Sequence, residues 1–387
     1  MSPLNVYQQV FSVSLCANMI RTDKNTAAEL QKLLAEKVSP VLSDIDPGWR
    51  VAWEPVVWKR SPLYPSTPLG NAWFVAKHDS LEFEDGKQYR TLVVSIAGTA
   101  GNNAVIEQDS DIHHVIHPDS WASSGLDSLQ TAPIIQNNAT PTPEDPPIIS
   151  NGFGQAVHRL INYTMSYSEE PPLGEWLKSQ VESHPDTRFI FAGPSLGAAL
   201  ACSTAYVLTK GNVLPRGNVF VYPTAGPSPG NMAFVKSFKE LFPSSEGTLT
   251  GYKHWNTNIV NPLDAVPYGY CTDSSYTTRT LDKVTTMFGA PAVPFVQRMV
   301  GILITRSKGT YYPIPSSIIE SAVELPQVAP KTVEEFMVAG LPQHEKPYLD
   351  SILGGSSESE FDIQDVIKTL LTQVPEEQPV MAGGDSE

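Results

Sequence analysis

The chain has 387 residues, enough for one large α/β domain or two domains of ordinary size. Its hydrophobic content of 41% supports a sizeable core, and its formal net charge of −15 argues against nucleic acid as a partner. The three cysteines are far apart and odd in number, so we expect buried, reduced thiols rather than disulfides or a zinc site.

Residues 1–21 lack the basic start and the unbroken apolar run of a secretory signal, because Gln8, Gln9 and Asn18 interrupt the apolar residues. No run reaches the roughly 18 uninterrupted apolar residues that a membrane span requires. We therefore expect a protein without a transmembrane segment. It would stay in the cytoplasm or leave the cell without a cleaved signal.

One helix and two strands are predicted near the N-terminus. Leucines recur at helical spacing from Leu30 onward, and we expect their helix to begin near residue 22 and to end at Pro40. Alternating aromatic and β-branched residues predict strands at residues 49–53 and 73–75. Residues 1–70 are therefore expected to form an extension of helix and strand packed on the core.

A buried strand is predicted over residues 89–96, and the glycine-rich residues 97–101 follow it. The lysine pattern of a P-loop is absent, which argues against a phosphate site. In a serine hydrolase this turn suits one half of an oxyanion hole, with the backbone amide and hydroxyl of Thr99 as donors.

Residues 102–150 are polar and irregular, with a proline-rich stretch at 141–147. Asp111, His113 and His117 could converge on a metal ion, but their spacing matches no closed zinc pattern. We therefore interpret the histidines of this stretch as solvent-facing or lid residues and predict no metal site. A long insertion directly after the oxyanion turn is typical of a mobile lid.

The middle of the chain carries the pattern G-x-S-x-G at residues 193–197. An apolar run of strand type precedes it at residues 189–191, and a small-residue helix follows as far as Leu208. This is the context of a nucleophile elbow, a turn so sharp that its serine is strained and its flanking positions are glycine. We expect Ser195 to be the nucleophile and the Leu196 amide, at a helix N-terminus, to be an oxyanion donor.

A serine nucleophile needs a base, and the base needs an orienting acid; α/β-hydrolases present the three in the chain order Ser, Asp, His. Asp264 follows a predicted strand at residues 248–260 and lies in a turn, whereas the later aspartates follow no strand. His344 is the only histidine after Asp264, which makes it the base by elimination. His254 falls inside the predicted strand and is interpreted as structural.

The C-terminal third is less regular. Residues 268–330 are expected to form a cap-like insertion, and their apolar stretch at 288–304 to form a fixed wall of an acyl pocket. A capped helical turn is predicted at residues 332–336. The acidic tail, residues 354–387, is expected to be partly disordered, with one amphipathic helix at 361–374.

Six stretches, in order, resemble motifs of the class 3 lipase family, the fungal-type triacylglycerol lipases. Five of them are a strand and oxyanion turn, a helix start, a turn before the elbow, an N-x-x-D-x-V-P segment and an H-x-x-x-Y pair, at residues 93–99, 151–153, 184–186, 261–267 and 344–348. The sixth, G-P-S-P-G-N-M-A-F at residues 226–234, is similar to the family's G-x-P-x-x-G-N-x-x-F stretch. The resemblance covers residues 71–353. It implies an α/β-hydrolase fold, with a mostly parallel central sheet flanked by helices and with residues 102–150 and 268–330 as lid-like and cap-like insertions.

The same resemblance implies a lipase or esterase that acts through Ser195, His344, Asp264 and an acyl-enzyme. Its substrate would be a lipid or another acyl ester, it would touch a lipid interface transiently, and it would need neither cofactor nor metal. A phospholipase, including an exported effector, is the alternative enzyme. A non-catalytic scaffold is the alternative of a different class, and the intact set of three residues argues against it.

Three positions depart from the family pattern. Pro194 stands where the family usually has histidine and Ala198 where it usually has glycine, but neither of those residues supplies chemistry. Ala97 replaces the usual arginine, which leaves open what supports the oxyanion turn.

Overall fold

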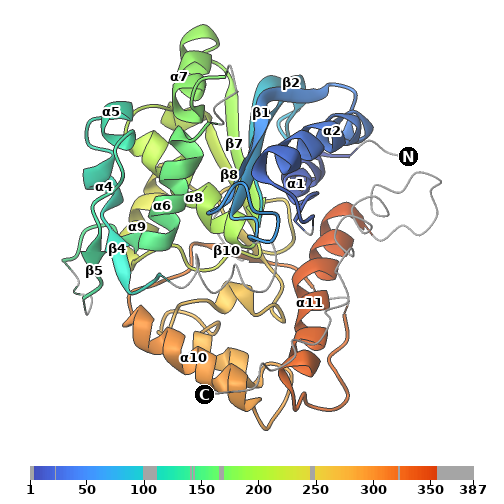
Figure 1. Cartoon of the computed structure of the whole chain (residues 1–387), viewed down its shortest axis with the longest axis vertical. Helices are drawn as coiled ribbons and strands as arrows, with labels where there is room; N and C mark the ends of the chain where they lie inside the picture. The colour runs from blue at the N-terminus through green and yellow to red at the C-terminus, as the bar shows by residue number, and fades with distance from the viewer. Residues whose placement is uncertain are drawn as a thin grey trace.

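The structure is a computed structural model that describes residues 4–21, 23–98, 111–139, 142, 144–164, 170–244, 249–320 and 323–354. Within them, a seven-stranded sheet runs in the order β1-β2-β3-β7-β8-β9-β10 (Figure 1). The first three strands pair antiparallel, and every later pair is parallel, as predicted for the central sheet. The strands are β1 (Trp49–Trp58), β2 (Asn71–Glu82), β3 (Gln88–Ile96), β7 (Arg188–Pro194), β8 (Val219–Thr224), β9 (Asn258–Val260) and β10 (Ser316–Ile318).

Helices cover both faces of this sheet, because its central strands are apolar on both sides. Along β3, Leu92 and Val94 enter one hydrophobic core, whereas Val93 enters the other. The helices form two layers on opposite sides of the sheet (Figure 1), and each layer packs into one of these two cores. The first layer is α6 (Asn151–Asn162), α7 (Leu173–Ser183), α8 (Leu196–Lys210) and α9 (Met232–Leu241), and the second is α1 (Val6–Cys16) and α2 (Ala27–Ile45).

Helix α1 has no counterpart in the sequence prediction. It begins with a capping box between Asn5 and Gln8, and every one of its residues except Gln8 is buried. A helix that is buried on nearly all sides lacks the polar face by which an amphipathic helix is recognised. The apolar residues near the N-terminus therefore form a core helix.

Both predicted ends of the next helix were wrong. Helix α2 begins after Thr26, whose side chain accepts a hydrogen bond from the Glu29 backbone N–H, and it continues through Pro40 to Ile45. A proline inside a helix removes one backbone hydrogen bond. The buried stripe of the helix continues beyond Pro40 with Leu42 and Ile45, and the packing of that stripe outweighs the missing bond.

The strand predicted at residues 248–260 was also wrong over most of its length. Strand β9 covers only Asn258–Val260. Gly251 and Asn256 have φ angles of 76° and 62°, so the chain turns twice before it becomes extended. His254 consequently lies in a loop, where its Nε2 is 2.8 Å from the Thr250 carbonyl oxygen.

Part of the insertion after the oxyanion turn is packed on the core where the structure describes it. A small sheet of β4 (His114–Ile116), β5 (Gln136–Asn137) and β6 (Ile149–Ser150) carries two short helices, α4 (Pro118–Trp121) and α5 (Leu126–Leu129). Ile112, Ile116 and Leu129 are buried in the same core as α6. These residues would have to leave that core if the whole expected lid moved as one unit. Residues 102–110 of the expected lid lie outside the described residues.

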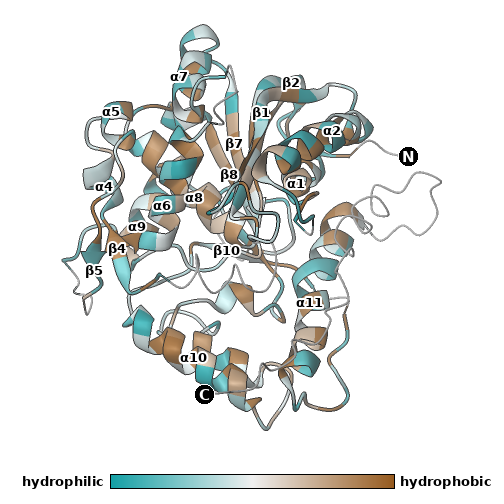
Figure 2. Ribbon diagram, in the orientation of Figure 1, coloured by the Kyte–Doolittle hydropathy of each residue, from teal (hydrophilic) through white to brown (hydrophobic). Residues whose placement is uncertain are grey.

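A third apolar cluster builds the cap at one end of the molecule (Figure 1). It joins Val300 of α10 to Phe336 of α11, and it packs against Tyr268, close to Asp264. Figure 2 shows apolar and polar patches alternating along both helices. The cap elements and the segment after them are η2 (Val266–Tyr268), η3 (Leu281–Thr286), α10 (Pro294–Ser307), α11 (Val333–Leu349) and η4 (Asp350–Gly354).

One expectation from composition is confirmed. Cys16, Cys202 and Cys271 are all free and buried. Among the described helices, none combines the length and the apolar character needed to cross a bilayer. The tail helix expected at residues 361–374 lies outside the described residues.

Candidate active site

Ser195 lies between the end of β7 and the start of α8, with φ 57° and ψ −128°. A positive φ is strained for a residue with a Cβ and persists only where the surroundings enforce it. Here the Ser195 N–H donates to the Thr224 carbonyl at 2.8 Å, and the Ser195 carbonyl accepts from the Ala198 N–H at 3.0 Å. Hydrogen bonds on both sides of the residue therefore hold the sharp turn that the sequence predicts.

The glycines of the G-x-S-x-G pattern are required by the close approach of β3. A Cβ on Gly193 or on Gly197 would lie 2.3 Å from the Ile96 carbonyl oxygen. Gly98 follows β3, and a Cβ there would lie 3.2 Å from the Ser195 Cβ. The turn after β3 is thus packed directly against the serine, where a second oxyanion donor belongs.

The N-terminal segment supports this turn. Asn18 follows α1 and is only 4% exposed, and its Oδ1 accepts a hydrogen bond from the Gly98 N–H at 2.9 Å. On β3, three residues before Gly98, the Ser95 hydroxyl donates to the Val13 carbonyl oxygen at 3.0 Å. These two hydrogen bonds support the segment in which Ala97 stands where the family usually has arginine. Thr99, the expected second donor, lies outside the described residues.

Asp264 is fully buried, in a turn directly after β9. Its Oδ1 accepts from the Val266 N–H at 3.0 Å, and its Oδ2 accepts from the Tyr348 hydroxyl at 2.7 Å. His344 Nδ1 also lies 2.8 Å from Oδ2. A buried carboxylate needs such partners, because burial without them would cost several kcal/mol.

Helix α11 is fastened to the turn that carries Asp264. The Asn261 side chain donates to the backbone and side-chain oxygens of Gln343, at 2.8 and 3.0 Å, and the Asn261 N–H donates to the Tyr348 hydroxyl at 3.0 Å. Burial and the charge of Asp264 raise the pKa of Tyr348 well above 10, so its hydroxyl keeps its proton and remains a donor. His344 and Tyr348 are four residues apart on one helix face, so both reach Asp264.

His344 is the titratable group of the pair that solvent can reach, with 21% of its side chain exposed. Burial lowers the pKa of His344, but the negative charge of Asp264 and the hydrogen bond to it together raise this pKa by more. The net pKa therefore lies above the ordinary 6.5. Because Nδ1 faces Asp264, Nε2 is left as the nitrogen that can accept a proton.

Parallel topology gathers these segments at one edge of the sheet. Ser195 follows β7 and Asp264 follows β9, and both strands pair with β8 in parallel, so their carboxyl ends face the same way. Helix α11 carries His344 and places its ring in contact with Asp264. Within the described residues, no hydrogen bond joins the Ser195 hydroxyl to His344.

The other candidates from the sequence lie elsewhere. Asp273 accepts hydrogen bonds from Ser275 and Tyr312, and His254 contacts only its own loop. The sequence allowed Asp111, His113 and His117 to converge without predicting a metal site there. Of the three, Asp111 and His113 are in contact, whereas His117 Nε2 lies 2.9 Å from Gln136 Oε1.

A strained serine at a strand-to-helix turn, with a buried aspartate–histidine pair at the same sheet edge, is an arrangement typical of serine hydrolases of the α/β-hydrolase fold. Residues 122–269 match the family model described as lipase (class 3). The family resemblance seen in the sequence is thereby confirmed, and the chain is a carboxylic ester hydrolase of the lipase and esterase class.

The solved structure of M37 lipase shows the same fold. M37 lipase is similar to this chain with a TM-score of 0.63 at 20% identity, over 95% of this chain and 98% of that one. Nonglycosylated LIP2 lipase of Yarrowia lipolytica matches with a TM-score of 0.42 at 17% identity, over 67% of this chain and 71% of that one. A lipase of Rhizopus microsporus var. chinensis matches with a TM-score of 0.38 at 16% identity, over 69% and 70%. A search of curated proteins found no match.

Proposed function

We propose that the chain hydrolyses carboxylic esters of lipids, with Ser195 as nucleophile, His344 as general base and Asp264 as the group that orients the base. The observation that carries this proposal is the 2.8 Å contact between His344 Nδ1 and buried Asp264 Oδ2. It presents a basic Nε2 at the sheet edge where the strained Ser195 lies, and that is the arrangement that nucleophilic catalysis by serine requires.

The reaction proceeds in two acyl transfers. His344 Nε2 takes the proton of the Ser195 hydroxyl while Oγ attacks the ester carbonyl, and the negative charge that develops on the carbonyl oxygen is stabilised by the Leu196 amide and by Thr99. The imidazolium then protonates the departing alcohol, and an acyl-enzyme remains. Water, deprotonated by His344, attacks that ester and releases the fatty acid and Ser195.

We further propose that the cap, residues 268–330, and the start of α11 form the side of the molecule that meets lipid. Val338 and Leu341 precede His344 on α11 and are 73% and 38% exposed, and Phe295 of α10 is 53% exposed. A contiguous exposed apolar patch is typical of a surface that contacts an apolar partner, and we propose that these side chains contribute to one. The α/β-hydrolase unit would comprise residues 71–353, with residues 1–70 packed on it.

The proposal is tested by Ser195→Ala with a series of p-nitrophenyl esters of increasing acyl length. We expect activity to fall by roughly 10⁴-fold or more, because the hydroxyl forms the covalent intermediate. Ser203→Ala is the matched control: Ser203 lies in the same helix, is buried, and donates only to the Ala199 carbonyl oxygen. Equal activity in the two folded variants would contradict the proposal.

The base is tested in the same assay. His344→Ala should be nearly as damaging as Ser195→Ala, whereas His254→Ala should leave activity largely intact because His254 contacts only the Thr250 carbonyl oxygen. The opposite ranking of the two histidine variants would refute the assignment of the base.

A further inference from the structure

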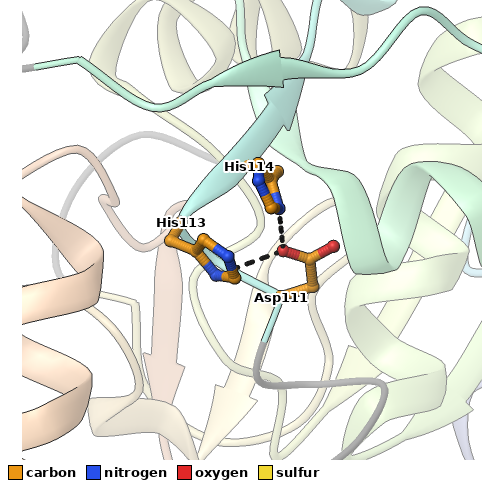
Figure 3. Close-up of side chains that lie close together, drawn as sticks. All are labelled: Asp111, His113 and His114. Carbon is orange, nitrogen blue, oxygen red and sulfur yellow. Dashed lines mark hydrogen bonds and ion pairs between the residues drawn. The ribbon is translucent and has the colours of Figure 1, made fainter.

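We propose that Asp111, His113 and His114 form a binding site for one divalent transition-metal ion of the zinc and copper class. Their donor atoms all lie within 4.8 Å of one another. Figure 3 shows both imidazole rings directed at the same carboxylate oxygen, from the segment that leads into β4. None of the three residues has a role in the ester hydrolysis proposed above.

The distances fit a small coordination sphere. His114 Nδ1 lies 2.8 Å and His113 Nδ1 3.3 Å from Asp111 Oδ1. In a tetrahedral site with metal–ligand bonds of about 2.0–2.1 Å, neighbouring donor atoms lie roughly 3.3–3.4 Å apart. A metal ion would therefore require a shift of about half an ångström in the closer pair and almost none in the other.

The donor set selects the class of metal. Two imidazole nitrogens and one carboxylate oxygen suit Zn²⁺, Cu²⁺, Co²⁺ and Ni²⁺, whereas Ca²⁺ and Mg²⁺ prefer oxygen ligands alone. The side chains of His113 and His114 are 45% and 34% exposed, and that of Asp111 is 28% exposed. An ion can therefore enter from solvent, and water can complete its coordination.

Surrounding hydrogen bonds already hold the donors in place. Asp111 Oδ2 accepts from the Asn151 side chain at 2.6 Å, which leaves Oδ1 for the two histidines. The carbonyl between the donors, that of Ile112, accepts from the Tyr311 hydroxyl at 2.7 Å and from the Asn138 side chain at 3.3 Å.

The backbone of the two histidines is fixed as well. The His113 carbonyl accepts from the Asn138 N–H at 2.9 Å, and His114 pairs with Asn137 of β5 in the small sheet. A partner of a ligating side chain, as Asn151 is of Asp111, orients that ligand, and losing such a partner typically costs 10- to 100-fold in affinity. A site held this firmly before the metal arrives loses little entropy on binding.

Isothermal titration calorimetry with ZnCl₂ tests the proposal. The sample is the untagged full-length protein, from which any metal has first been removed with a chelator. We expect one equivalent of Zn²⁺ to bind, and no heat with CaCl₂. His113→Ala and His114→Ala should each weaken Zn²⁺ binding by at least the ~10- to 100-fold that the loss of an outer partner costs. His117→Ala is the matched control, because His117 lies three residues further on and contacts Gln136 instead.

A spectroscopic measurement on the unaltered protein keeps the test independent of how the variants fold. With one equivalent of Cu²⁺, the electron paramagnetic resonance spectrum should show hyperfine coupling to two imidazole nitrogens. Absence of Zn²⁺ binding would overturn the proposal, and so would equal Zn²⁺ affinity in His114→Ala and His117→Ala or a Cu²⁺ spectrum without nitrogen coupling. In those cases the two histidines only contact Asp111 Oδ1, without a metal ion between them.

Discussion

The substitution Asn18→Ala tests whether the N-terminal segment holds the proposed oxyanion turn in the position that catalysis requires. Asn18 Oδ1 is the acceptor for the Gly98 N–H, and both residues are buried. Without that acceptor, a buried N–H is left unpaired, at a cost of about 1–3 kcal/mol. The turn can avoid this cost only by moving toward water or toward another acceptor.

Movement of the turn would displace the neighbouring Ser195. The Ser195 Cβ lies 3.2 Å from where a Cβ on Gly98 would be, so the two have no space between them to absorb a shift. Removing an oxyanion donor outright costs roughly 10²- to 10³-fold in kcat. A displaced turn should cost less, and we expect kcat to fall about 10- to 100-fold with KM nearly unchanged, because these donors act on the charge of the transition state.

The assay measures kcat and KM on a soluble short-chain ester, well below the unfolding temperature of the variant. Ser14→Ala is the matched control: Ser14 lies in α1, is fully buried, and loses one hydrogen bond to the Phe11 carbonyl oxygen without touching Gly98. If the two variants lower kcat by the same factor, the link from Asn18 to the oxyanion turn is refuted.

Two further predictions follow from the site. Gly197→Ala should lower the stability by at least the 1–3 kcal/mol typical of overpacking, because the new Cβ would lie 2.3 Å from the Ile96 carbonyl oxygen; an unchanged unfolding midpoint in urea would contradict the close approach. The base must be neutral, so kcat/KM should rise with pH through a pKa above 6.5, and Asp264→Asn should move that limb to lower pH; a limb below 6.5 in the native protein would contradict the raised pKa of His344. Because the pKa of His344 is higher in the folded than in the unfolded protein, the charged His344–Asp264 pair contributes to the free energy of unfolding. This contribution is fully present at pH values below the unfolded pKa, and it is lost as the pH rises through the folded pKa.

The elbow could be predicted from sequence because its determinants are local. The apolar strand, the two glycines around Ser195 and the small-residue helix lie within residues 188–208, and the structure places them as β7, a strained turn and α8. Chain order then identified Asp264 and His344, since only one histidine remained after the acid. The structure brings these two into contact at 2.8 Å.

The supports of the site could not be predicted in this way. Asn18 and Gly98 are separated by 80 positions, and the hydrogen bond between them leaves no local pattern in the sequence. Helix α1, which positions Asn18, is buried all round and so shows no helical period of polar residues. Pro40 ended the predicted helix too early, because tertiary packing across a proline cannot be seen in a local propensity.

The site therefore depends on parts of the chain that the family match does not include. The match ends at residue 269 and begins at residue 122, so it covers neither α1 nor the helix that carries His344. These two outer parts are joined to each other: Arg21 forms an ion pair with Glu345 at 2.7 Å, and the Gln8 side chain donates to the Ile352 carbonyl oxygen at 2.9 Å. Both side chains of the ion pair are mostly buried, so solvent screens their attraction less than at an open surface. One N-terminal segment thus contacts both the turn after β3 and the helix that carries His344, and we expect it to hold the two in place relative to each other.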